Sequence, residues 1–188
     1  MKKLIFISLL FSILSLSVSA QKPTKAEKAA QLEQEFQQTR QLIESNHFQF
    51  ELNRVYPQDG QDLSRFNPRG KFVITDSVAK GTLPFFGRAY SLPYGEGGGI
   101  EFDGVMKDQS LKIEHKKKRK ILIYRFSITA KNDTYQISME ISGGGNCSVN
   151  LNSNNRAQIS YSGTVSPVKD ETGTVSYTHL RAHETGAY

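Results

Sequence analysis

The fold is decided by residues 121–141, which read Ile-Leu-Ile-Tyr-Arg-Phe-Ser-Ile-Thr-Ala-Lys-Asn-Asp-Thr-Tyr-Gln-Ile-Ser-Met-Glu-Ile. Large apolar side chains recur at every second position, first from Leu122 to Ile128 and then from Tyr135 to Ile141. A period of two is that of a strand with one buried face. Residues 131–133 between the two runs have the composition of a hairpin turn. The stretch therefore predicts two antiparallel strands joined by a tight turn.

The same alternation extends in both directions from this hairpin. It appears in the segments Phe48–Leu52, Phe72–Ile74, Leu111–His115, Cys147–Leu151 and Ile159–Val165, with glycine- and asparagine-rich turns at 143–146 and 152–156. No stretch after Ser45 has helical spacing, and a parallel sheet needs crossover helices. We therefore expect a mainly β domain over residues 47–171, an antiparallel meander of about eight to ten short strands that closes as a barrel or folds as a β-sandwich.

One helix precedes the strands. Thr24 and Glu27 have the spacing of a capping box, and apolar residues from Ala29 to Ile43 recur near the helical period. The helix is expected from about residue 25 to 45, and its other faces are polar. We expect this amphipathic helix, in a segment that spans 21–46, to pack on the β domain with one stripe.

Residues 1–20 have the pattern of a signal peptide. Two lysines follow Met1, the apolar run from Leu4 to Leu16 is interrupted only by serines, and residues 18–20 are Val-Ser-Ala. That run is too short to cross a hydrocarbon core of ~30 Å. We expect cleavage after Ala20, export to the periplasm or the medium, and no transmembrane segment in the mature chain.

The last residues form a separate segment, 172–188. Residues 175–185 resemble the conceptual translation of a sequencing adapter, so we expect an artefactual or disordered tail there. His179 and His183 within it have helical i, i+4 spacing, but without a third ligand the pair does not indicate a metal site.

Charge and reactive residues narrow the function classes. The net charge is +6, and its densest cluster is His115–Lys120. Nucleic-acid readers interleave aromatic residues with such cations, and this run has none, so we expect a solvated hairpin tip and no nucleic-acid partner. His47 and His115 stand in no motif with a nucleophile, and Cys147 alternates with core residues. We expect no catalytic residue, no metal and no cofactor, hence no enzyme.

The segment from Leu83 to Ile100 is dense in aromatic residues, glycine and proline around one arginine. Arginine can bind a carboxylate or phosphate through two hydrogen bonds, and aromatic rings offer apolar contact. The candidate ligand-binding residues are Phe86, Arg88, Tyr90 and Tyr94. The alternative is a strand corner whose rings cover one end of the barrel. Because strand-like residues follow Gly95–Gly99, this glycine run does not predict a phosphate-binding loop.

The chain resembles exported proteins of Gram-negative bacteria that carry domain of unknown function 4251. The resemblance covers about residues 32–167 and rests on Phe48-Gln49-Phe50, Asn53 to Gln58, Leu83 to Gly99, and the segments 151–156 and 159–163. It implies a signal peptide, one helix and a lipocalin-like antiparallel barrel, but no activity. It also implies a possible O-glycosylation acceptor at Ser77 in Asp76-Ser77-Val78, although a plain turn would have the same composition.

Three functions are compatible with these patterns. The first is a non-catalytic binding or carrier module of the cell envelope for a small amphipathic ligand. The second is a structural or protein-interaction domain that binds an envelope protein through the helix or a strand edge. A hydrolase is the third and the least favoured.

Overall fold

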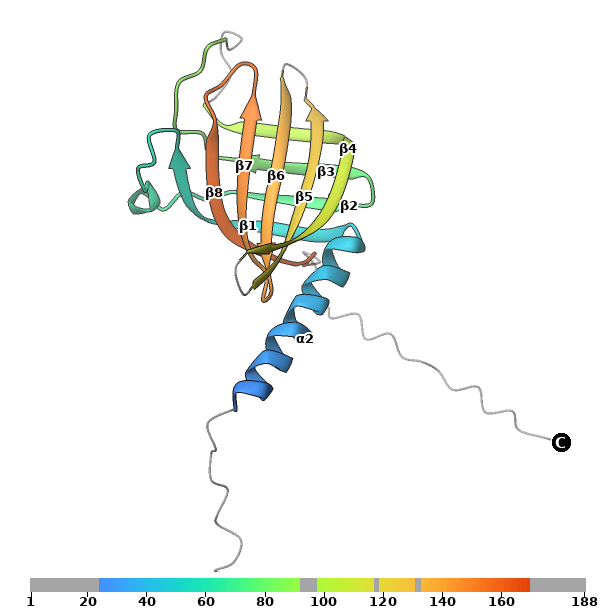
Figure 1. The fold of residues 1–188 in the computed structure, drawn as a ribbon. Helices are drawn as coiled ribbons and strands as arrows, with labels where there is room; N and C mark the ends of the chain where they lie inside the picture. Colours follow the sequence, from blue (N-terminus) through green and yellow to red (C-terminus); the bar gives the residue numbers. More distant parts are fainter. Residues whose placement is uncertain (1–23, 92–97, 117–118, 131–132, 170–188) are drawn as a thin grey trace, which may run out of the picture.

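The computed structural model describes residues 24–91, 98–116, 119–130 and 133–169, and within them eight antiparallel strands form a closed barrel. Each strand pairs with the next one along the chain, and the last pairs with the first (Figure 1). The strands are β1 (His47–Pro57), β2 (Lys71–Thr75), β3 (Val78–Leu83), β4 (Ile100–Lys116), β5 (Arg119–Thr129), β6 (Thr134–Ser142), β7 (Asn146–Ser153) and β8 (Ile159–Pro167). The predicted mainly β meander is confirmed, and of the two alternatives the barrel forms and the sandwich does not.

Period-two hydrophobicity orients every strand in the barrel. In β6 the residues Tyr135, Ile137, Met139 and Ile141 are buried, whereas their neighbours in the sequence are exposed or half-buried. Cys147, Val149 and Leu151 do the same in β7. One face of each strand therefore points into a common interior. Irregular pairing interrupts the alternation in β1 between Leu52 and Arg54 and in β4 between Lys107 and Ser110.

Large side chains fill the interior of the barrel. A row of rings crosses it, with centroids 5.0 Å apart for Phe50 and Phe72, 5.9 Å for Phe72 and Phe102, and 6.2 Å for Phe102 and Tyr135. Phe50 and Phe72 have an exposed fraction of 0%, as does Tyr161. A side chain beside a water-sized space would have accessible surface, so these side chains leave no such space against them.

The helix α2 (Lys25–Glu44) begins at a capping box, as the sequence predicts. The Thr24 side chain accepts a hydrogen bond from the Glu27 N–H, and the Glu27 carboxylate accepts one from the Thr24 N–H. The second half of the helix supplies the residues that are buried against the barrel, Phe36, Thr39 and Ile43. Leu32, one turn earlier, is 64% exposed, and the first half of the helix projects away from the barrel (Figure 1).

The basic run of the sequence joins β4 to β5, as a hairpin tip would. At the start of β5, Lys120 forms an ion pair with Glu33 of the helix at 2.9 Å, and its ammonium lies 5.7 Å from the centroid of the Phe36 ring. This contact ties the β4–β5 hairpin to α2. Within the described part of the chain, no helix has the length and apolar character that a membrane span requires.

Candidate functional site

Residues Pro84–Ser91, here called the covering segment, follow β3, and two of them, Phe85 and Phe86, pack against the core of the barrel. Its backbone is bonded to the corner between β7 and β8: Tyr90 N–H donates to Asn155 O at 2.8 Å, and Ala157 N–H donates to Arg88 O at 2.9 Å. The Tyr161 hydroxyl donates to Pro84 O at 2.9 Å from within the barrel. The covering segment is thus fixed both by the corner and by an interior side chain.

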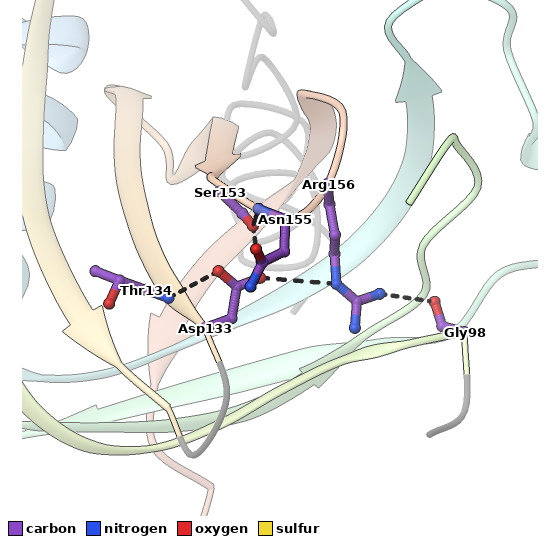
Figure 2. A network of polar contacts seen from close by, with 6 residues as sticks. All are labelled: Gly98, Asp133, Thr134, Ser153, Asn155 and Arg156. Carbon is purple, nitrogen blue, oxygen red and sulfur yellow. Dashed lines mark hydrogen bonds and ion pairs between the residues drawn. The ribbon is translucent and has the colours of Figure 1, made fainter. Parts of the chain in front are cut away.

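Beneath this segment lies a buried charge pair, Arg156 and Asp133, with side chains only 4% and 7% exposed (Figure 2). The Arg156 Nε and the Asp133 carboxylate are 3.9 Å apart, and this Nε makes no hydrogen bond. The guanidinium donates to Gly98 O at 3.4 Å, and its carbon lies 5.2 Å from the centroid of the Phe85 ring. Arg156 therefore contacts both Phe85 and Gly98, which lie 13 positions apart in the sequence.

Asp133 has further partners that hold its carboxylate in place. It accepts hydrogen bonds from the Thr134 N–H at 2.8 Å and from the Ser153 hydroxyl (Figure 2). The Ser153 hydroxyl in turn accepts the Asn155 N–H at 3.0 Å. This network joins the start of β6 to the end of β7 and to the corner between β7 and β8.

Tyr161 lies close enough to Arg156 for the arginine to affect the pKa of its hydroxyl. Burial raises the pKa of Tyr161, and the nearby Arg156 opposes that increase only in part. The hydroxyl of Tyr161 therefore keeps its proton at neutral pH and serves as a hydrogen-bond donor to the covering segment.

A hollow of about 610 Å³ lies on the outer side of the covering segment. It is lined by Pro57, Gln58, Asp59, Leu63, Phe86, Gly87, Arg88 and Ala157. Its apolar contacts come from the end of β1, from Leu63 and from Phe86. Its charged residues are the exposed Arg88 and the exposed Asp59. An apolar wall beside one arginine is suited to a molecule with an apolar body and an anionic group.

Phe86, in the wall of this hollow, stacks on an aromatic ring of the neighbouring surface. The rings of Phe86 and Phe66 are stacked with centroids 6.5 Å apart, and Phe66 is 59% exposed. Arg65 lies over the Phe66 ring at 4.9 Å. Both residues belong to the short 3-10 helix η1 (Ser64–Phe66), which follows β1. The surface here thus combines exposed aromatic rings with cations.

The four ligand-binding residues suggested by the sequence lie in different settings. Phe86 and Arg88 both line the hollow. Tyr90 is 62% exposed, and its side chain is absent from the hollow's lining. Tyr94 falls outside the described residues. Ser77 is exposed in the turn between β2 and β3, next to Asp76, whose φ of 54° lies in the left-handed region.

Sequence reasoning missed Arg156 and Asp133 as a pair. Residues 148–156 were interpreted as turn chemistry only, and Asp133 as part of a hairpin turn. The two lie 23 positions apart in the sequence, and no spacing rule joins a turn residue of one hairpin to the corner of another. The available signal was the resemblance, whose quoted residues include Arg156.

Other chemistry-bearing residues lie apart from this end of the barrel. His47 and His115 are exposed, and Cys147 is buried, so that burial raises the pKa of its thiol. A high thiol pKa disfavours the nucleophilic thiolate at neutral pH. Among the described residues, no group of three or more histidine, cysteine or carboxylate side chains could hold a metal ion.

Comparisons with known proteins point to one family. The family model described as "Domain of unknown function (DUF4251)" matches residues 30–165. The crystal structure of a DUF4251 family protein from Bacteroides eggerthii is similar, with 23% sequence identity and a TM-score of 0.52 over 74% of this chain and 91% of that one. A search of curated proteins found no match. The likeness to the crystal structure supports the barrel fold and says nothing of a ligand.

Proposed function

Since the chain belongs to the DUF4251 family, whose role is unassigned, we propose from its geometry that it is a non-catalytic binding module for a small amphipathic anion. The proposed site is the hollow beside the covering segment. The observation that carries this proposal is the juxtaposition of Phe86, Leu63 and Arg88 around one open volume beside the covering segment.

The filled interior decides where the ligand would bind. An eight-stranded barrel either fills with its own side chains or keeps room for one small guest. Here the rings of Phe50, Phe72 and Phe102 occupy the centre. A lipocalin-like carrier with its cargo in the lumen is therefore disfavoured, and the outer hollow is the better candidate.

The fixed backbone favours binding without rearrangement. Two backbone hydrogen bonds, from Ala157 N–H to Arg88 O and from Tyr90 N–H to Asn155 O, join the covering segment to the corner between β7 and β8. The backbone that carries Phe86 and Arg88 is therefore held in place before a ligand binds. A preorganised site loses less conformational entropy on binding. An apolar chain against Phe86 and Leu63 would place its charged end at Arg88.

Titration of the ¹⁵N-labelled protein with decanoate below its micelle concentration tests this proposal. We expect shifts of the amide signals of Leu63, Gly87 and Ala157, and much weaker shifts with acetate or with a decyl ammonium ion. Arg88→Gln should weaken decanoate binding about tenfold, the equivalent of ~1.4 kcal/mol. Phe86→Ala should weaken it as well.

The matched control is Arg125→Gln, which changes an exposed arginine on β5 that donates to Ser138. It should leave the decanoate affinity unchanged. Equal binding of the anionic and cationic amphiphiles, or shifts confined to residues far from the hollow, would refute the assignment.

We also propose that this module acts outside the cytoplasm, on the basis of the leader-like residues 1–20, which lie outside the described residues. The intact mass of protein recovered from the periplasm or medium of its host should correspond to a chain that begins at Gln21. A chain that still carries Met1 would contradict this. An added mass that is lost in Ser77→Ala would show that Ser77 carries a glycan.

A further inference from the structure

The second half of β4 pairs with another described strand on one side only. Strand β3 pairs with β4 only from Ile100 to Val105, whereas β5 pairs with β4 from Met106 to Lys116. No described strand pairs with the other side of β4 beyond Met106. The residues Gln109–His115, here called the β4 edge, thus belong to a two-stranded ribbon, and all of them are exposed or half-buried.

The direction of the backbone groups can be read from the start of this ribbon. Met106 N–H donates to Ser77 O on the β3 side at 2.7 Å, so it points away from β5. Met106 is opposite Ile128. In an antiparallel ladder, opposite residues either exchange both hydrogen bonds or both point outward. Ile128 therefore also turns its N–H away from β4.

The same alternation determines in which direction the backbone groups of the β4 edge point. Tyr124 and Leu122 follow Ile128 at intervals of two along β5, and they lie opposite Leu111 and Ile113. Leu111 and Ile113 therefore turn their N–H and C=O groups away from β5, toward the open side. These groups form a template to which an extended segment can add as a further strand.

The side chains of the edge would contact such a segment on both faces. Ile113 is 41% exposed, and Leu111 is half-buried against the core. Their face is apolar, whereas the opposite face carries the exposed Lys112 and Glu114. A strand of alternating apolar and charged residues matches this pattern.

The positive charge of the β4–β5 hairpin favours an acidic partner. The sequence from Lys107 to Arg119 holds six lysine or arginine residues against two acidic residues, Asp108 and Glu114. Two copies of this stretch would each bring a net charge of +4, six cations less two acidic residues, and would repel each other. An acidic strand would be attracted. We propose that the β4 edge binds an extended acidic segment of another protein by strand addition.

Two features of the edge agree with a selective role. Lysine on an edge strand and an irregularity such as the one at Asp108, whose φ is 53°, both oppose indiscriminate pairing. They leave the outward groups of Leu111 and Ile113 available to a partner that satisfies the charge. The edge lies on the β4–β5 hairpin, which Lys120 ties to Glu33, apart from the residues that line the hollow.

The test uses capped eight-residue peptides on the full exported chain, with binding followed by amide shifts and calorimetry. A peptide of alternating glutamate and valine should bind and shift the signals of Gln109–His115. The same peptide with lysine in place of glutamate should bind at least tenfold more weakly. A glutamate–valine peptide methylated on alternate backbone nitrogens should also lose at least tenfold, because it cannot complete the ladder.

Variants of Ile113 separate the backbone contribution from the side chain. Ile113→Pro removes an outward N–H, which proline tolerates on an edge, and should abolish binding. Ile113→Thr keeps the N–H and should weaken binding only a few-fold. Unchanged circular dichroism establishes that each variant is folded, and the methylated peptide tests the idea on the unmodified protein.

Some outcomes would overturn the proposal. Equal affinity for the methylated and unmethylated peptides would show electrostatic attraction without strand addition. Self-association that Ile113→Pro abolishes would identify a second copy of the chain as the occupant. Shifts confined to the hollow would show that the peptide occupies the proposed anion site, and a loss of decanoate binding alone would leave this inference untouched.

Discussion

Arg156 and Asp133 bring opposite charges into a place that water barely reaches. Removing one partner of a buried pair leaves the other charge without compensation, at a cost of about 3–5 kcal/mol. We expect Asp133→Asn to lower the free energy of unfolding by about 3 kcal/mol. This is the lower end of that range, because the Arg156 Nε and the Asp133 carboxylate are 3.9 Å apart and therefore attract each other less strongly than a closer pair. Urea denaturation followed by circular dichroism measures the loss.

The companion variants test whether the two residues act as a pair. Arg156→Met removes the charge but retains an apolar chain, and the double variant should cost less than the sum of the two single changes. Strict additivity would mean that Asp133 matters through Thr134 and Ser153 alone.

Cys147 gives a second prediction at the level of a residue. Burial, with a smaller effect from Glu140, raises the pKa of its thiol in the folded protein. In the unfolded chain a thiol ionises near pH ~8.5, so above that pH only the unfolded state releases the proton. The stabilisation is complete below about pH 8.5 and declines as the pH rises, by up to ~1.4 kcal/mol per unit.

The measurement is the free energy of unfolding between about pH 8 and 9, below the range where tyrosines of the unfolded chain ionise. We expect it to fall with pH in the original chain and to stay nearly flat in Cys147→Ala. Burial also raises the pKa of Tyr124 to about 12, so a further decline should appear in both proteins at higher pH. An equal slope in the lower window would contradict the role of Cys147.

Contact between strands β1 and β8 depends on one glycine. A Cβ atom at Gly163 would lie 2.1 Å from Glu51 O and 2.7 Å from the Phe50 ring. Because backbone atoms cannot move aside as side chains do, Gly163→Ala should lower the free energy of unfolding by about 3 kcal/mol or prevent folding. Gly98→Ala is the matched control, since nothing lies within 4 Å of that Cβ position. Thermal unfolding compares the two.

Regular elements could be predicted from the sequence, and irregular ones could not. The period of two located β5 to β8, and the capping box located the start of α2, because both signals are local. The alternation at Leu111–His115 was predicted as a strand, but its continuity with the strand that begins at Ile100 was not, since the irregularity at Asp108 breaks the alternation. Phe86 and Arg88 were singled out by composition, but Leu63 and Pro57 join them only through the closure of the barrel.

At the scale of the whole molecule, the described strands and the helix all lie between residues 24 and 169. The helix cap, the β1–β8 pairing and the buried network are complete within that range. The free energy of unfolding of a chain of residues 21–171 should therefore lie within about 0.5 kcal/mol of that of residues 21–188, as measured by urea denaturation. A larger loss would show that residues 172–188 stabilise the domain and would contradict their interpretation as an appended tail.

The seam between β1 and β8 joins the first strand of the barrel to the last, with Phe48 opposite Pro167. On a ribosome or in a secretion channel, β1 emerges more than a hundred residues before the strand that completes its pairing. Until Ile159–Pro167 has been synthesised, the sheet has two edge strands without partners. The row of interior phenylalanines, Phe50, Phe72 and Phe102, is then incompletely enclosed. The barrel can therefore close only when the whole of β8 is available to pair with β1.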